Sequence, residues 1–280
     1  MHIDLLEISQ LRGYEQAEFR FRPHMNLIVG VNGVGKSTVL DAIRIALMRA
    51  LPRLTGVKIR RENFESTDIM NDRSALTIDL QLDNAGYLLH QVIYQPRKQT
   101  IDRTEEGAVR EEVLELKERD ELLYIDEKGR SQPIESPKDI NNHIKPMIGR
   151  PLAVHFSTSR SLPGKAQASQ SERSGGELSL ALADSLRSRE LQIREFTNWW
   201  RVQEELGTPE RIEALKQAII RFLDNFTDVQ VTGKRRDFEP TLKLYKRDTA
   251  LTARQLSDGE RGMLALVLDL ARRLALANPN

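Results

Sequence analysis

One short segment near the N-terminus constrains the fold more than any other part of the sequence. Residues 30–37 are GVNGVGKS, a glycine followed by four residues and then by Gly-Lys-Ser. The apolar run MNLIVG over 25–30 precedes this segment and predicts a buried strand. Apolar residues at helical spacing follow it and predict an amphipathic helix over 36–51. A strand, a glycine-rich turn and a helix in this order are the context of a phosphate-binding loop.

The residue types in this loop are those that bind the phosphates of a nucleoside triphosphate. Glycines let consecutive backbone N–H groups turn toward a phosphate, and the helix start adds a partial positive charge. Lys36 can reach the β- and γ-phosphates, and the Ser37 hydroxyl can ligate Mg²⁺. The alternative is a glycine-rich turn that binds nothing. We expect ATP and Mg²⁺ to bind here, with the nucleotide contacted by Gly30, Asn32, Gly33, Val34, Gly35, Lys36, Ser37 and Thr38.

A second motif stands near the other end of the chain. Residues 256–262, LSDGERG, open a segment over 258–277 that is apolar almost all round and predicts a buried helix. By itself, Ser257 predicts a helix N-cap followed by an acidic first turn. A similar group, Ser174–Glu177, follows a low-complexity loop over 161–175, and we expect it only to cap a helix.

The rest of the chain predicts both sheet and helix. Short alternating runs between 53 and 130, with Asp83–Gly86 as a turn, predict an antiparallel meander. A buried strand is expected over 152–156, and helices over 177–205 and 209–224.

These elements suggest three segments. We expect a phosphate-loop lobe with the antiparallel meander over 1–160, and a flexible loop with a helical lobe over 161–226. Strands and the final helix, which return to the core of the phosphate-loop fold, are expected over 227–280.

Composition excludes several classes of protein. With 42 Lys and Arg against 41 Asp and Glu, the chain is not a generally basic nucleic-acid coat. The absence of cysteine excludes disulfides and thiolate catalysis, and the 5 histidines have no metal-ligand spacing. No apolar run reaches the length of about 20 residues that a membrane helix needs, and the N-terminus is not a secretory signal. We expect a cytoplasmic protein with no membrane partner.

Together the two motifs resemble the ABC-type ATPases. The N-terminal order of a strand, the turn Leu11–Tyr14, a second strand and then residues 25–43 resembles the head of the branch of RecF and the structural-maintenance-of-chromosomes proteins. Residues 256–262 are similar to the LSGGQ-like signature of that family, in which the signature helix faces the γ-phosphate held by the opposite protomer. The resemblance implies an α/β fold, an ABC-ATPase head (a P-loop NTPase) with an antiparallel β-subdomain and a helical lobe. It also implies a dimer around two ATP·Mg²⁺. The signature residues in trans would be Ser257, Asp258, Gly259 and Glu260, and Arg12, in the turn after the first strand, would touch the phosphates.

The middle of the chain is similar to a bacterial group of ATP-binding proteins that includes the Septu anti-phage defence ATPase PtuA. The residues that carry this similarity are Ser157–Arg160 and Glu195–Trp200, with Glu204 and Glu205. The resemblance implies an ATP-driven switch that gates a partner effector, a nuclease of the HNH type, in anti-phage defence.

One departure from the family concerns hydrolysis. ABC-type heads carry, shortly after the signature helix, the Walker B strand that ends in an aspartate and a catalytic glutamate. The sequence stops at Asn280, where that strand should begin, so we expect a fold truncated before it. The general base is expected beyond Asn280, so no catalytic residue is assigned in this sequence. ABC-type heads also carry a glutamine after the first lobe, and no residue of this sequence is assigned to that role.

Two alternatives remain open. A DNA repair or recombination ATPase would bind DNA directly through basic clusters at 53–61 and 234–236, and its affinity would fall steeply with salt. A nucleotide-stabilised scaffold would bind ATP without turnover. The aromatic residues Phe196, Trp199 and Trp200 are at helical spacing, which favours a core or partner contact over a platform for base stacking.

Overall fold

The computed structural model divides the chain into two compact units, Met1–Pro151 and Leu152–Asn280. The three segments predicted from the sequence stay a prediction. The structure describes residues 2–83, 87–101, 111–126, 128–139, 151–156, 176–186, 193–223, 225–233, 241–247 and 249–277.

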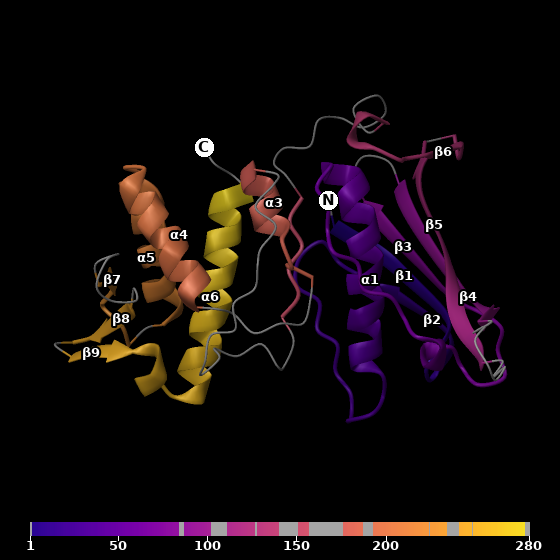
Figure 1. Cartoon of the computed structure of the whole chain (residues 1–280), viewed down its shortest axis with the longest axis horizontal. Helices are drawn as coiled ribbons and strands as arrows, with labels where there is room; N and C mark the ends of the chain where they lie inside the picture. The colour runs from indigo at the N-terminus through magenta and orange to yellow at the C-terminus, as the bar shows by residue number, and fades with distance from the viewer. Residues whose placement is uncertain are drawn as a thin grey trace, which may run out of the picture. The chain divides into compact units, whose positions relative to one another are not determined.

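The first unit is built on a six-stranded sheet in the order β2-β1-β3-β4-β5-β6 (Figure 1). The strands are β1 (His2–Leu11), β2 (Tyr14–Arg20), β3 (Leu76–Asp83), β4 (Tyr87–Ile101), β5 (Glu111–Ile125) and β6 (Ser131–Pro133). Each neighbouring pair is antiparallel, so the predicted meander is confirmed. β3 and β4 pair up to Asp83 and Tyr87, and the predicted turn between them lies mostly outside the described residues.

Helix α1 (Lys36–Thr55) packs on one face of this sheet (Figure 1). The period of two in β3 places one face of the strand against the helix, because successive side chains point to opposite sides of a sheet. The buried residues of that face are Leu76, Ile78, Leu80 and Leu82. The predicted helix over 36–51 is confirmed and continues to Thr55, where Gly56 in the left-handed conformation ends it.

The predicted buried strand over 25–30 is wrong for the described structure. These residues belong to no strand. The Arg22 N–H donates to the side-chain oxygen of Asn26, and the Asn26 side-chain amide donates to the Arg22 carbonyl. None of residues 25–30 is buried, and the exposed fractions of Met25, Leu27, Val29 and Val31 lie between 77% and 90%. A buried strand needs paired neighbours, and no strand in the described part of the chain pairs with this segment. The phosphate loop is therefore joined to α1 but not to a central strand.

The second unit combines helices with a small sheet. Its helices are α3 (Gly176–Leu182), α4 (Ile193–Glu205), α5 (Pro209–Phe222) and α6 (Asp258–Ala277). Its sheet has the order β7-β8-β9, with the antiparallel strands β7 (Asp228–Thr232), β8 (Thr241–Lys246) and β9 (Thr249–Thr252). Single turns of 3₁₀ helix occur at Ser66–Asp68 in the first unit and at Ala253–Gln255 in the second.

One hydrophobic core holds the second unit together. It joins α4, α5 and α6 to β7 and β8, and Phe196, Trp199 and Trp200 are buried in it. The prediction that these aromatic residues form a core stripe is confirmed. α6 has the predicted bounds over its described length, although Met263 and Leu274 on its outer face are exposed.

Two predictions for the second unit need correction. The helix expected over 177–205 is not continuous, because α3 ends at Leu182 and a turn with Asp184 at a positive φ follows. Residues 152–156 are half-buried but form no strand, although the His155 N–H donates to the Ser185 carbonyl. Within the described residues, no helix is long and apolar enough to cross a membrane.

Candidate nucleotide-binding site

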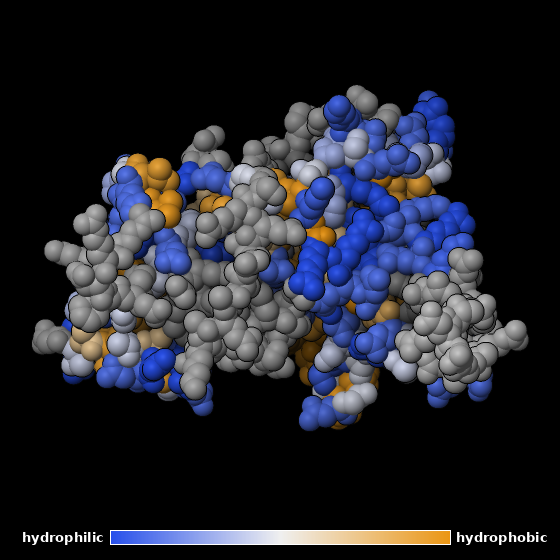
Figure 2. Space-filling model, in the orientation of Figure 1, coloured by the Kyte–Doolittle hydropathy of each residue, from blue (hydrophilic) through white to orange (hydrophobic). Residues whose placement is uncertain are grey.

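The glycines of the phosphate loop occupy positions that a side chain would disturb. Gly33 and Gly35 have φ values of +85° and +94°, in the left-handed region that glycine adopts without strain. A Cβ on Gly30 would lie 2.8 Å from the Cγ1 atom of Val34, so glycine lets the two ends of the loop approach each other. The loop residues 30–34 are exposed, and Figure 2 shows hydrophobic side chains at the end of this unit where Figure 1 draws the loop.

The N-terminus of α1 is electrostatically open to an anion. Its N-cap is Gly35, which supplies no side-chain hydrogen bond, and the first turn contains no acidic residue. The first N–H groups of a helix have no partner within the helix, and the helix dipole gives this end a partial positive charge. A phosphate is the kind of group that such an end binds.

Lys36 bends back over the loop. Its Nζ atom donates to the carbonyl oxygens of Gly30 and Val31, at 2.7 Å each. The ammonium group therefore lies against the first two residues of the loop, close to the uncapped start of α1. This arrangement brings a positive charge and free backbone donors to the same place.

Arg12 is tied to α1 and to the segment before β3. Its guanidinium donates to Asp68 at 2.7 Å, to Asp41 at 3.0 Å and to the Thr38 hydroxyl at 3.4 Å, and it lies over the ring of Phe64. Burial lowers the pKa of Arg12, but the hydrogen bonds and charges of the two aspartates outweigh this effect and raise that pKa. Arg12 also has a φ of 51°, in the two-residue hairpin turn that joins β1 to β2, where the favoured turn types use positive φ values.

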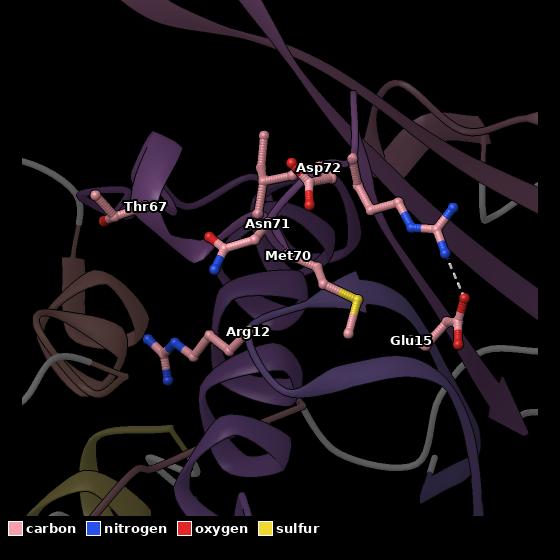
Figure 3. A pocket seen from close by; sticks show the side chains of 8 residues that line it. Arg12, Glu15, Thr67, Met70, Asn71 and Asp72 are labelled. Carbon is pink, nitrogen blue, oxygen red and sulfur yellow. Dashed lines mark hydrogen bonds and ion pairs between the residues drawn. The ribbon is translucent and has the colours of Figure 1, made fainter.

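A cavity of about 590 Å³, within the size range of ligand pockets, lies beside Arg12. It is lined by Arg12, Glu15, Thr67, Ile69, Met70, Asn71, Asp72 and Arg73. Figure 3 shows Arg12 and Glu15, which pairs with Arg73, on different sides of the cavity, with Met70 and Asn71 between them. Arg12, which lines the cavity, also bonds Thr38 in α1, but no residue of α1 or of the loop is among the lining residues.

The predicted signature residues lie in the second unit, at the start of α6. The predicted N-cap is confirmed: the Glu260 N–H donates to the Ser257 hydroxyl oxygen at 3.3 Å. The Ser257 N–H and hydroxyl donate in turn to the Glu260 carboxylate, at 2.9 and 2.8 Å. These two bonds lower the pKa of Glu260, and Lys246 at 3.6 Å adds to the effect. Unlike α1, α6 therefore begins with one N–H capped by a side chain and with acidic side chains.

The loop provides several groups that can bind the phosphates of ATP but only one ligand for a metal ion. The open helix start and Lys36 suit phosphate oxygens. For Mg²⁺, the exposed Ser37 hydroxyl provides one ligand, and the described residues contain no group of three acidic or histidine side chains that could hold a metal. Mg²⁺ at nucleotide sites commonly takes few protein ligands and completes its shell with phosphate oxygens and water. Ser37 is therefore compatible with a metal that arrives with the nucleotide.

The sequence analysis missed three residues that shape this site. Asp41 and Asp68 position Arg12, and Tyr14 donates from its hydroxyl to the Val34 carbonyl in the loop at 3.1 Å. Asp41 lies five residues after Lys36 in the predicted helix, and only this closeness in sequence could have identified it as a residue of the site. Asp68 and Tyr14 reach the site through tertiary contacts. The binding roles of the predicted site residues stay predictions.

The fold and the site define a phosphate-loop protein of mixed α and β structure. Residues 5–227, well over half of the chain, match the family model described as an AAA domain. The chain therefore belongs to this family, and parts of it are similar to RecF and Rad50 proteins.

Three known proteins illustrate the similarity. The Escherichia coli protein named "Retron Ec83 probable ATPase" is 22% identical over 327 residues, which cover 98% of this chain and 59% of that protein. The DNA replication and repair protein RecF of Magnetococcus marinus is 42% identical over 94 residues, covering 33% of this chain and 25% of its own length. The solved structure of the recombination mediator protein RecF-ATPrS aligns with 98% of this chain and 81% of that chain, at 14% identity and a TM-score of 0.42. The chain thus spans less than two thirds of the curated relatives it matches.

Proposed function

We propose that this chain is an ATP-binding head that dimerises around ATP·Mg²⁺ and acts as a switch for a partner effector. ATP is contacted by the loop residues Gly30, Asn32 and Gly33 to Thr38, with Arg12 at the phosphates. The signature residues Ser257 to Glu260 of one protomer face the γ-phosphate held by the other. Ser37 is the Mg²⁺ ligand from this chain.

One observation carries the proposal most strongly. The start of α1 has neither a side-chain cap nor an acidic residue, and Lys36 Nζ lies against the same loop. The N–H groups at this start and the positive end of the helix dipole favour an anion there. The match to the AAA domain family supports a nucleotide as that anion.

The biological role is the more distant part of the proposal. The retron relative suggests an antiviral role, and the resemblance to the Septu group suggests a nuclease of the HNH type as the gated partner. Hydrolysis requires a general base, for which we propose no residue of this chain. If none is supplied, the ATP-bound dimer is a stable scaffold rather than an enzyme in turnover.

A DNA repair function is the second candidate, favoured by the names of the RecF and Rad50 relatives. The basic cluster at 53–61 supports it only in part. Arg53 forms an ion pair with Asp120, and Arg61 lies 3.8 Å from the same carboxylate, so part of this charge is neutralised within the unit. Direct DNA binding predicts an affinity for duplex DNA that falls steeply as salt is raised, and an affinity that does not change with salt contradicts it.

The proposed dimer, in which ATP lies between the loop of one protomer and the signature residues of the other, is called the sandwich. It is tested with two matched glycine variants in α6. A Cβ on Gly259 or on Gly262 meets no atom within 4 Å, so both positions accept a side chain. Glutamine is a better helix former than glycine by about 0.5–1 kcal/mol, so both variants should fold. Gly259→Gln places its side chain in the first turn of α6, where the partner's phosphate would approach, and Gly262→Gln is the control.

We expect ATP·Mg²⁺ to raise the light-scattering mass of the wild type from 32.0 kDa toward twice that value. Gly262→Gln should respond in the same way. Gly259→Gln should still bind ATP but remain a monomer, and its apparent affinity for ATP should lack the gain that dimerisation gives the wild type. A wild type that binds no ATP contradicts the proposed function. ATP binding without a change in mass, or a Gly259→Gln variant that dimerises like the control, contradicts the sandwich alone.

A further inference from the structure

The hydroxyl of Tyr14 controls the orientation of one peptide unit in the phosphate loop. Tyr14 is the first residue of β2, and its Oη atom donates to the Val34 carbonyl oxygen at 3.1 Å. The Val34 carbonyl and the Gly35 N–H belong to the same peptide unit, and in a trans peptide they point in opposite directions. By holding the carbonyl on its own side, Tyr14 directs the Gly35 N–H away from itself.

The ring of Tyr14 is itself fixed in place. A Cβ on Gly35 would lie 2.7 Å from the Cε2 atom and from the hydroxyl oxygen of Tyr14, so the ring lies directly against the Gly35 backbone. On β2, Phe19 packs edge-on against the same ring, with the centroids 5.9 Å apart and the planes at 89°. The hydroxyl is therefore carried by a paired strand and a packed ring, and it needs little ordering to reach the loop.

Gly35 is a position where this orientation matters. It is the N-cap of α1, and its N–H is one of the helix-start donors that the helix itself leaves unpaired. At a φ of +94° the backbone of Gly35 has conformations available to it that other residues lack, so an unsupported peptide there could rotate. An external hydrogen bond to Val34 opposes that rotation.

We propose that Tyr14 is a positioning residue that presents the Gly35 N–H to the phosphate chain of a nucleoside di- or triphosphate. This inference rests on the proposed function, because it assumes that the loop binds ATP. Tyr14 does not touch the nucleotide, and it acts through the Val34–Gly35 peptide. Its contribution is preorganisation, which lowers the cost of arranging the loop when the phosphates bind.

The test removes only the hydroxyl. Tyr14→Phe keeps the ring that packs against Gly35 and Phe19. Tyr245→Phe is the matched control, because the Tyr245 hydroxyl donates to Gln230 at 3.2 Å in the other unit. Loss of one neutral hydrogen bond predicts that Tyr14→Phe binds ATP·Mg²⁺ about 3- to 10-fold more weakly by calorimetry, while Tyr245→Phe binds like the wild type.

A spectroscopic measurement separates positioning from a general structural role. The sequence contains two Val-Gly pairs, Val29-Gly30 and Val34-Gly35, so carbonyl-¹³C valine combined with ¹⁵N glycine selects the amides of Gly30 and Gly35. Val29→Ile, at an exposed position, removes the Gly30 signal and leaves that of Gly35 alone. On addition of ATP·Mg²⁺, the Gly35 amide proton should shift downfield in the Val29→Ile background. It should shift less when Tyr14→Phe is added.

Each outcome has a distinct meaning. If the Val29→Ile protein binds ATP, and Tyr14→Phe weakens binding and reduces the Gly35 shift, the proposal is supported. If Tyr14→Phe binds as tightly as its parent, or binds more weakly with the full Gly35 shift, Tyr14 does not position that peptide and the proposal is overturned. If the wild type binds no ATP, the proposed function fails, and this inference fails with it.

Discussion

Lys36→Ala is expected to weaken ATP binding by about 100-fold or more, because a charge-assisted contact to phosphate is removed from the loop. In the folded chain, Lys36 Nζ bonds only the carbonyls of Gly30 and Val31 among the described contacts, at 2.7 Å each. Both partners are exposed backbone atoms that water can satisfy when the lysine is removed. The variant should therefore lose nucleotide affinity without losing its fold.

The measurement is calorimetric titration with ATP·Mg²⁺, together with thermal melting of the same samples. Lys58→Ala is the matched control, since Lys58 is an exposed lysine of the same unit outside the loop. The control should bind ATP like the wild type. Equal affinities for Lys36→Ala and the wild type would place the nucleotide elsewhere, and a large fall in the melting temperature would show that Lys36 also stabilises the unit.

Arg273→Met is expected to destabilise the second unit by about 3–5 kcal/mol, the usual cost of breaking a buried ion pair from one side. Arg273 and Asp269 are both buried side chains of α6, and the Arg273 Nε atom lies 3.0 Å from each carboxylate oxygen of Asp269. The Arg273 Nη1 atom also donates to the carbonyls of Ala181 and Ala183, at 2.5 and 2.9 Å. These carbonyls lie at the end of α3, where a helix leaves its last acceptors unpaired.

Removal of the guanidinium therefore leaves a buried carboxylate without its arginine, and it takes one donor from a buried and from a half-buried carbonyl. Urea unfolding measures the loss of stability. Arg261→Met is the matched control, because Arg261 pairs with the exposed Asp258 in the same helix and such surface pairs contribute about 1 kcal/mol or less. The double variant Asp269→Leu/Arg273→Met should be more stable than Arg273→Met, because it removes the buried carboxylate together with the buried guanidinium. A cost for Arg273→Met no larger than for Arg261→Met would contradict the prediction.

The features that could be predicted from the sequence are those that depend on neighbouring residues. The start of α1 follows from the glycines and from the apolar spacing after Lys36, and the β3–β4 hairpin follows from alternation on both sides of a turn. The N-cap at Ser257 follows from its position three residues before Glu260. In each case the hydrogen bonds or the buried face involve residues of the same helix or the same hairpin, which are close together in the sequence.

The features that could not be predicted depend on partners that are distant in sequence. The apolar run at 25–30 has the composition of a buried strand, but burial requires paired strands, and the described part of the chain provides none for it. The break after Leu182 likewise depends on packing: Arg273, far along the chain, binds the carbonyls that end α3.

The candidate site divides in the same way. Lys36 and the loop glycines were identified from their spacing alone, because a phosphate loop is a local backbone structure that requires these residue types. The partners of Arg12 at Asp41 and Asp68, and the contact of Tyr14 with Val34, exist only because the sheet and α1 bring separate segments together. The sequence by itself determined which residues can turn toward a phosphate. Only the tertiary structure decided which side chains hold them there, because those hydrogen bonds join residues whose separation along the chain carries no information about their distance in space.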